Sequence, residues 1–286
     1  MEASMQALAT WQPPADLIGI FTDIDDTLTT DGAITPDALA ALGALKAAGL
    51  HVIPITGRPV GWSERFAAAW PVDAVVAENG AVALRHIPEK TLSEIGLQRL
   101  SDKHKQLSKI YQQDADTRAA NFTAMHTVLE HIERVVPLAR RAQDSAGRET
   151  DIAIDHSEFA QLPQASIDQC VALMRGAGMV ATVSSIHINA WFGAHNKWEG
   201  ARWIVRELFG RELADERARW VYVGDSTNDQ IMFQHFEHSV GVANIARFLP
   251  QLTHLPKFVS RGERGAGFAE LTHHLLAARG TQAPAR

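Results

Sequence analysis

The sequence has little of three features that would each assign it to a narrow class. It contains a single cysteine, Cys170, among 286 residues, so it cannot form an internal disulfide, and we expect a reducing, cytoplasmic setting. No uncharged run is long enough to span a membrane, and the N-terminus lacks the basic start and apolar stretch of a signal peptide. No Lys/Arg run stands out against a net charge of -6, so neither a nucleic-acid nor a membrane partner is expected.

What is present is an ordinary globular composition, with 46% hydrophobic and 21% charged residues, in a length that suits two domains. Apolar strand-like runs alternate with helix-like runs towards both ends of the chain, as where residues 51–56 precede residues 62–70. Strands that are apolar on both sides and separated by helices form parallel sheets. We therefore predict an α/β fold with a Rossmann-like parallel sheet core and helices on both of its faces.

The middle of the chain follows a different pattern. Residues 119–143 have the periodicity of a long amphipathic helix, and short strand-like runs occur at 151–155 and 180–185. We predict that this part is an α/β cap domain inserted into the core, with the cap at 86–187 and the catalytic core at 1–85 and 188–286.

Polar side chains follow the ends of the predicted parallel strands, and Lys197 opens the helix before the last of these polar segments. The carboxyl ends of parallel strands meet at one edge of an open sheet, where ligands bind. Clustered carboxylates repel one another unless a cation lies between them, and Mg2+ prefers carboxylate oxygens, waters and a substrate phosphate. The side chains expected at this edge are Asp23, Asp25, Asp26, Thr56, Arg58, Asn79, Asp225, Asn228 and Asp229.

A set of this kind suits phosphoryl transfer, which needs an in-line nucleophile and neutralised phosphate oxygens. Asp23, at the end of its strand, is placed to be the nucleophile, since carboxylates form acyl phosphates. Asp25, two residues further on, can protonate the leaving oxygen and later activate water.

Four segments resemble the four motifs of the haloacid dehalogenase superfamily of phosphatases. They are DIDDTLT at 23–29, PITGRP at 54–59, Lys197, and VGDSTNDQIMF at 223–233. Their order, the AENGA segment at 77–81 and the long insert after the second motif are similar to the Cof-like and sucrose-phosphatase-like subgroup, type IIB. The insert matches that subgroup only in its position and in the order of its elements.

The resemblance implies roles for single residues. Asp23 would be the nucleophile and Asp25 the acid/base, while Thr56, Lys197 and Asn228 would hold the phosphate. The implied Mg2+ ligands are Asp23, Asp25 through its backbone carbonyl, Asp225 and, directly or through water, Asp229.

Discrimination between substrates should come from the cap, because every phosphomonoester presents the same phosphate group to the core. We expect Arg148 and Asn189 of the cap to face the substrate, with Arg58 and Asn79 as further substrate contacts in the core. Asp26 stands where many members of the family have glycine, and we expect no catalytic role for it.

The predicted function is Mg2+-dependent hydrolysis of a small phosphorylated metabolite, in particular a sugar phosphate, through an aspartyl-phosphate. A phosphomutase on the same fold is an alternative, in which the cap would hold a bisphosphate and keep water out. A non-catalytic phosphosugar-binding or receiver-like regulator is the alternative from another class. In a receiver, however, the lysine ends the final strand, after the phosphorylated acid and the threonine, whereas Lys197 precedes the last acidic loop.

Overall fold

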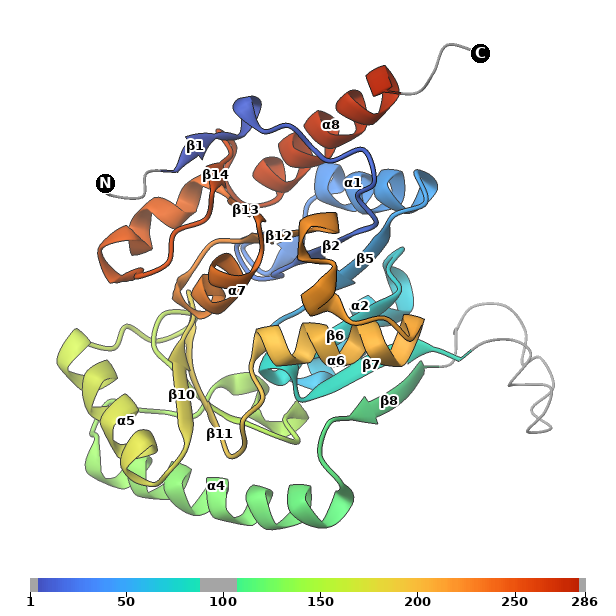
Figure 1. The fold of residues 1–286 in the computed structure, drawn as a ribbon. Coiled ribbons are helices and arrows are strands. Elements are labelled where there is room, and N and C mark those ends of the chain that lie inside the picture. Colours follow the sequence, from blue (N-terminus) through green and yellow to red (C-terminus); the bar gives the residue numbers. More distant parts are fainter. Residues whose placement is uncertain (1–4, 88–106, 283–286) are drawn as a thin grey trace.

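The computed structural model describes residues 5–87 and 107–282 and has a six-stranded parallel sheet at its centre (Figure 1). The strands lie in the order β1, β14, β13, β12, β2, β5, and every adjacent pair runs parallel. A parallel bridge between Ile55 and Val76 joins β5 to the antiparallel sheet β6–β7–β8. The strands are β1 (Gln6–Ala7), β2 (Gly19–Thr22), β5 (His51–Pro54), β6 (Ala74–Ala77), β7 (Val82–His86), β8 (Leu107–Tyr111), β12 (Trp220–Gly224), β13 (His238–Gly241) and β14 (Phe258–Val259).

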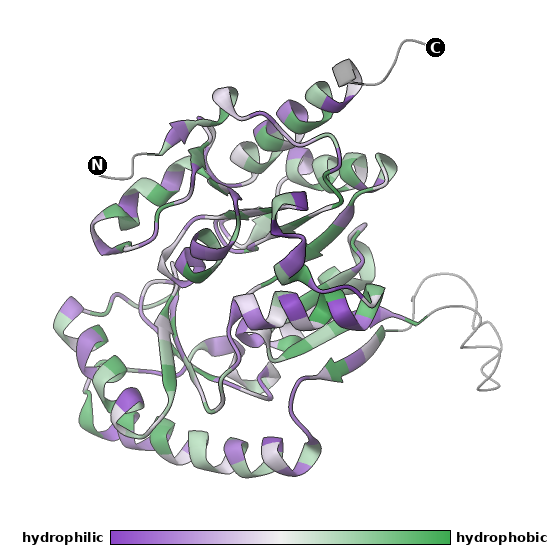
Figure 2. Ribbon diagram, viewed as in Figure 1, coloured by the Kyte–Doolittle hydropathy of each residue, from purple (hydrophilic) through white to green (hydrophobic). Residues whose placement is uncertain are grey.

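Alternate residues of the central strands belong to two separate apolar clusters. Ile20 and Val221 pack with α1, α2 and α8, whereas Phe21 and Tyr222 pack with α6 and α7. This period of two is the pattern of strands covered by helices on both faces, which confirms the predicted core. Figure 2 shows the apolar residues along β5, β6 and β7 in green. The helices are α1 (Pro36–Ala47), α2 (Val60–Ala69), α6 (Lys197–Phe209), α7 (Gln230–His235) and α8 (Arg264–Gln282).

A second layered unit, which we call the cap, comprises residues 115–191 (Figure 1, lower part). Its antiparallel sheet has the order β10, β11, β9, and its apolar cluster is shared with α4 and α5. Ile188 and Ala190 of β11 are buried in that cluster, so His187 and Asn189 point away from it, towards the core. The elements are α4 (Ala115–Val135), β9 (Ile152–Asp155), α5 (Gln164–Gly176), β10 (Val180–Val183) and β11 (His187–Trp191).

The strand pairings bear on where the insert begins and ends. β8 pairs with β7 beside the core, although residues 107–111 fall inside the predicted cap at 86–187. β11 is the central strand of the cap sheet, although most of it falls in the predicted core segment 188–286. We propose from these pairings that the inserted unit begins after β8 and ends after β11. Residues 88–106 of the predicted cap lie outside the described residues.

The long cap helix ends earlier than predicted. α4 begins after Asp114, whose side chain accepts a hydrogen bond from the Thr117 N–H, and it ends at Val135 instead of Gln143. Pro137 accounts for the difference, because proline has no N–H to donate and disfavours helical backbone in the residue before it. Within residues 5–87 and 107–282, no helix is both long and apolar enough to cross a membrane.

Candidate active site

Strand ends bring polar side chains together at one edge of the central sheet. Asp23 follows β2, Thr56 lies just beyond β5, Asp225 follows β12, and Asn244 lies just beyond β13. Lys197 is the first residue of α6 and reaches the same place, since its ammonium group contacts Asp23. Four of these five residues had been expected at this edge from the sequence, and Asn244 had not.

Three buried carboxylates form the centre of this group. Oxygens of Asp23, Asp225 and Asp229 all lie within 4.8 Å of one another. The Nζ atom of Lys197 donates to Asp23 Oδ1 at 2.6 Å and to Asp229 Oδ1 at 2.7 Å. Burial raises the pKa of Asp23 and of Asp225 well above the ordinary value, and the neighbouring carboxylates raise both further. Burial alone would lower the pKa of Lys197, but Asp229 and Asp23 outweigh it and raise the pKa.

Asp229 holds the loop that carries Asp225. Its Oδ2 accepts hydrogen bonds from the backbone N–H groups of Asp225 and Ser226, and its Oδ1 also accepts from the Tyr222 hydroxyl. Gly224 is required at the strand end, because a Cβ there would lie 2.5 Å from Asp229 Oδ2. Both carboxylate oxygens of Asp229 accept hydrogen bonds from the protein, so the main effect of this residue is to fix the loop. Its negative charge adds to the charges of Asp23 and Asp225.

The donor set fits a small divalent cation. Asp225 Oδ2 accepts from Asn244 Nδ2 at 2.9 Å, but its Oδ1 is buried and has no hydrogen-bond partner in the described part of the chain. Lys197 and Arg247, which lies 3.5 Å from Asp225 Oδ2, supply two positive charges against three buried carboxylates. A carboxylate oxygen without a donor is costly unless a ligand completes it. Oxygen donors of this kind are those that Mg2+ prefers. The side chains of Asp23 and Asp225 would hold the Mg2+ ion.

Arg58 joins the second aspartate of the first motif to the cap. Its Nε donates to Asp25 Oδ1 at 3.0 Å, its Nη1 to Asp144 at 3.1 Å, and its Nη2 to Glu158 at 2.6 Å. His187 Nε2 lies 2.9 Å from the other oxygen of Glu158. Burial alone would raise the pKa of Glu158, but His187 and Arg58 outweigh it and lower the pKa to about 2. Asp144, Glu158 and His187 had not been predicted as site residues.

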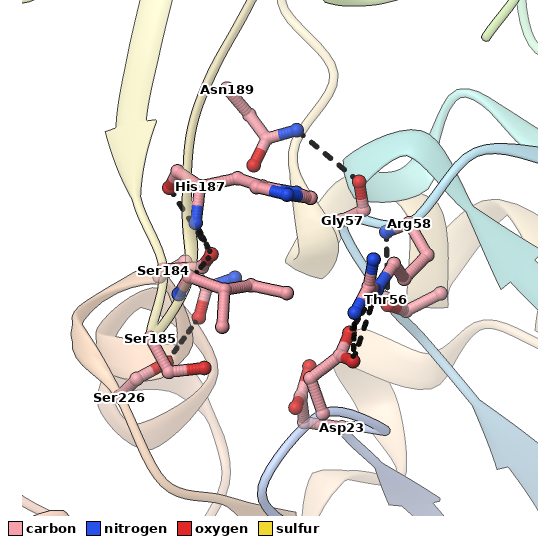
Figure 3. Close-up of a pocket in the computed structure, with 12 residues that line it drawn as sticks. Asp23, Thr56, Gly57, Arg58, Ser184, Ser185, His187, Asn189 and Ser226 are labelled. Atoms are coloured by element: carbon pink, nitrogen blue, oxygen red, sulfur yellow. Dashed lines mark hydrogen bonds and ion pairs between the residues drawn. The ribbon is translucent and has the colours of Figure 1, made fainter. Parts of the chain in front are cut away.

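The space around Asp23, which we call the Asp23 pocket, is closed by the turn between β10 and β11. Figure 3 shows Ser184, Ser185 and His187 across the pocket from Asp23 and Thr56. The pocket encloses about 10 Å³, close to the space that one water molecule needs. Six of the residues expected at the site line it, namely Asp23, Asp25, Thr56, Arg58, Asn189 and Asn228.

The two cap residues expected to face the substrate both bind the turn after β5. Arg148 Nη1 donates to the Gly57 carbonyl at 3.0 Å and to Asp151 at 2.8 Å. Asn189 Nδ2 donates to the same carbonyl at 3.2 Å and to Asp151 Oδ2 at 3.0 Å. Asn189 borders the Asp23 pocket, whereas Arg148 is buried behind it. These contacts position the turn between Thr56 and Arg58.

Asn79 and Asp26 lie at the margins of the site. Asn79 is buried and lines a different cavity, between α6 and the cap. Asp26 has a φ of 56°, in the left-handed region that glycine adopts most easily and that aspartate tolerates. Its carboxylate pairs with Arg247 at 3.1 Å and Arg264 at 3.2 Å.

Comparison with known proteins relates the chain to one family. The model of the haloacid dehalogenase-like hydrolases matches residues 20–252. YxeH of Bacillus subtilis (strain 168), which bears the provisional name of a phosphatase, is 26% identical over 292 residues. That alignment covers 91% of this chain and 98% of YxeH.

Solved structures share the fold along most of the chain. The structure of Thermoplasma acidophilum 0175 has a TM-score of 0.64 at 18% identity and covers 91% of this chain and 99% of its own. The sucrose-phosphatase of Synechocystis sp. PCC6803, in complex with sucrose and phosphate, has a TM-score of 0.62 at 15% identity, with coverages of 91% and 98%. At these identities the likeness concerns the fold alone.

Proposed function

Because the chain belongs to the haloacid dehalogenase-like hydrolases and is a phosphatase of the Cof-like, type IIB kind, we propose that it hydrolyses a small phosphorylated metabolite, in particular a sugar phosphate. The observation that carries the proposal is the position of Asp23. It lies buried at a strand end, paired with Lys197 and grouped with two further carboxylates. This is an arrangement for attack on phosphorus beside a cation.

Asp23 is the nucleophile in this proposal. Lys197 holds its Oδ1, and the second carboxylate oxygen forms the bond to phosphorus as the bond between phosphorus and the leaving alcohol breaks. Water then attacks the aspartyl-phosphate, which releases inorganic phosphate and restores the carboxylate. Lys197 keeps its proton throughout, because its pKa is raised, and it offsets part of the negative charge on the phosphate.

Asp25 is the acid/base. It would give a proton to the leaving oxygen in the first step and take one from water in the second. Arg58 holds the Asp25 carboxylate through Nε, so the orientation of this group depends on the turn after β5. The cap binds that turn at Gly57, which links closure of the cap to the position of the acid/base.

The phosphate and the cation complete the site. Thr56, Asn228 and Lys197 are assigned to the phosphate oxygens. Asp23, Asp225 and the backbone carbonyl of Asp25 would hold Mg2+. Asp229 would support them by fixing the loop that carries Asp225. When bound, Mg2+ would neutralise the phosphate oxygens as charge develops on them.

The substrate class is inferred from the cap. Polar side chains at the turn between β10 and β11, including Ser184, Ser185 and His187, border the Asp23 pocket and suit the hydroxyl groups of a sugar. The fold of the sucrose-phosphatase is similar, which supports a sugar phosphate. Because the closed pocket is so small, the cap has to move for a substrate to enter.

The charge balance favours a hydrolase over the phosphomutase alternative. A mutase has to hold a second phosphate away from Asp23, and this requires a cation that is not already paired. Three basic side chains beside the pocket each pair with at least two carboxylates: Arg58 with Asp25, Asp144 and Glu158; Arg148 with Asp144 and Asp151; Lys197 with Asp23 and Asp229.

Turnover of 4-nitrophenyl phosphate tests the proposal and separates an enzyme from a phosphosugar-binding regulator. We expect phosphate release with Mg2+, no release with a chelator, and recovery when Mg2+ is restored. A folded Asp23→Asn protein should lose nearly all activity. Full activity in chelator without metal would refute the need for Mg2+. A tenth of the wild-type rate in Asp23→Asn would refute Asp23 as the nucleophile.

A further inference from the structure

Two side chains of one short helix, Asn244 and Arg247, contact both the loop after β2 and the loop after β12. The 3₁₀-helix Ala243–Gln251 follows β13. Asn244 Nδ2 donates to the backbone carbonyl of Asp26 at 3.0 Å and to Asp225 Oδ2 at 2.9 Å. Arg247 follows one turn later, on the same side of the helix. Its Nη2 lies 3.1 Å from Asp26 Oδ2 and 3.5 Å from Asp225 Oδ2.

The two side chains of this helix differ in their freedom to move. Asn244 is buried, and its Oδ1 accepts a third hydrogen bond, from the Arg264 N–H at 2.8 Å. The Arg247 side chain is 48% exposed, and its Nε makes only a long hydrogen bond, 3.4 Å, to the carbonyl of Asn244. Asn244 is therefore fixed, whereas Arg247 can turn towards another carboxylate without disturbing the core.

Asp225 offers Arg247 an alternative partner. Its Oδ1 is buried and has no hydrogen-bond partner within the described residues, which leaves this oxygen for a cation. A guanidinium keeps its charge and binds carboxylates through charge-assisted hydrogen bonds. If Arg247 paired fully with Asp225, it would occupy the carboxylate and repel a second positive charge beside it. Arg247 and a metal ion therefore compete for Asp225.

Asp26 holds Arg247 at the edge of this competition. The guanidinium is 0.4 Å nearer to Asp26 than to Asp225, at 3.1 Å against 3.5 Å. The other carboxylate oxygen of Asp26 lies 3.2 Å from Arg264, and its backbone carbonyl accepts from Asn244. Asp26 is thus itself held in place on two sides, so it can fix the position of the mobile Arg247.

We propose that Asp26 is a positioning residue, which keeps the charge of Arg247 from pairing fully with Asp225 and so leaves that carboxylate open to a divalent cation. This role rests on the proposed function, because it requires Asp225 to bind Mg2+. Asp26 acts through Arg247 and takes no part in the chemistry at Asp23.

The affinity for Mg2+, measured by calorimetry in wild type, Asp26→Asn, Arg247→Ala and the double variant, tests this role. Asparagine keeps the size of Asp26 and tolerates its φ of 56°. Asp26→Gly is a second variant, since glycine adopts this conformation without strain. Asp31→Asn is the matched control, because Asp31 is also an aspartate with a positive φ, 51°, but pairs with Arg264 instead of Arg247.

Without the charge of Asp26, Arg247 should turn to Asp225, and the affinity for Mg2+ should fall about tenfold in Asp26→Asn and in Asp26→Gly. Arg247→Ala should bind Mg2+ at least as tightly as wild type, and the double variant should match Arg247→Ala. Asp31→Asn should match wild type. If the charge of Asp26 attracted the cation directly, its loss would instead lower the affinity by the same factor with and without Arg247.

Three results would overturn the role of Asp26 and leave the proposed function intact. They are wild-type affinity in both Asp26 variants, an equal loss with and without Arg247, and a loss in Arg247→Ala alone. No binding of Mg2+ by the wild-type chain would refute the proposed cation itself, and the role of Asp26 with it.

Discussion

At the scale of the residue, the two carboxylate oxygens of Asp225 differ, because one is hydrogen-bonded and the other has no partner. Asn244 binds its Oδ2, while Oδ1 is buried with no donor among the described residues. Burial, Asp23 and Asp229 raise the pKa of Asp225 by more than the nearby Arg247 lowers it, so the ionised form is unfavourable until further positive charge arrives. The proposed Mg2+ would supply that charge.

Asp225→Asn should remove most of the affinity for Mg2+. A ligand that binds only the folded chain raises its melting temperature, so Mg2+ should stabilise the wild-type protein and have little effect on the variant. We expect Mg2+ affinity to fall at least about tenfold, measured by calorimetry. The control is Asp215→Asn, at an exposed position of the short helix Leu213–Asp215. Equal Mg2+ affinity in Asp225→Asn and wild type would show that the cation is held elsewhere.

Asp23 and Asp225 could be predicted because each directly follows an apolar strand. Asn244 is the third residue after β13, so extending the search to the residues just beyond every strand end would have found it. Glu158 and His187 could not be found in this way. Glu158 meets Arg58 across 100 positions of sequence, and His187 belongs to a cap strand, so their contact depends on how the cap docks.

At the scale of the element, β11 and the turn after β5 act as one unit. Asn189 donates to the carbonyl of Gly57 and to Asp151, and the turn carries Thr56 and Arg58 on either side of Gly57. A Cβ on Gly57 would lie 3.3 Å from the amides of Asn189 and Asn79, so the turn fits closely against the cap. This contact indicates that Asn189 positions the turn, which differs from the substrate contact expected from the sequence.

Asn189→Ala distinguishes these two roles. If Asn189 positions the turn, kcat/KM should fall by a similar factor, about ten- to a hundredfold, for a sugar phosphate and for 4-nitrophenyl phosphate, because both depend on Thr56 and Arg58. The measurement is the ratio of the two kcat/KM values in wild type and variant. A loss confined to the sugar phosphate would restore the role in substrate recognition.

The elements themselves were largely predictable, and the exceptions have local or topological reasons. Strands apolar on both sides indicated a sheet covered on both faces, as the alternation of Ile20 and Phe21 between two clusters shows. Pro137, a signal present in the sequence, accounts for the early end of α4. The pairing of β11 with β9 is different, because which sheet a short apolar strand joins is decided by tertiary contacts.

At the scale of the whole molecule, two glutamates join core and cap. Glu78 is fully buried and accepts hydrogen bonds from the N–H groups of Val60, Glu149 and Thr150 and from the Thr150 hydroxyl. Glu158 pairs with Arg58 from the cap side. Glu78 thus anchors the cap beside the core, and Glu158 holds it closed over Asp25.

Glu78→Gln should weaken the anchor. The amide nitrogen replaces one acceptor with a donor, which leaves at least one buried N–H or O–H group facing another donor. The expected loss in the free energy of unfolding is about 1–3 kcal/mol, measured by urea denaturation. Glu64→Gln is the control, since the Glu64 side chain is 49% exposed and its change should cost little. An equal effect of the two substitutions would contradict the role of Glu78.

Glu158→Gln should change how stability depends on pH. The pKa of Glu158 is about 2 in the folded chain and 4.5 without these contacts, so its ionised form contributes stability that is complete above pH 4.5. That contribution is lost as the pH falls from 4.5 towards 2. The variant should therefore lose less stability than wild type across this interval in thermal melts, whereas Glu207→Gln, at an exposed position of α6, should follow the wild type. If stability falls with pH equally in Glu158→Gln and wild type, the pairing of Glu158 with Arg58 and His187 is not formed.

The central claim is that Asp23 carries the phosphoryl group between the two steps, and trapping that group tests it most directly. In Asp25→Ala, an activated aryl phosphate needs little protonation to leave, whereas hydrolysis of the intermediate lacks its base and should slow by about 10²–10⁴. Mixing this variant with 4-nitrophenyl phosphate and Mg2+, then quenching in acid, should show a burst of nitrophenol and, by peptide mass spectrometry, one phosphoryl group on Asp23. Steady turnover without a burst and without phosphate on Asp23 would contradict the account.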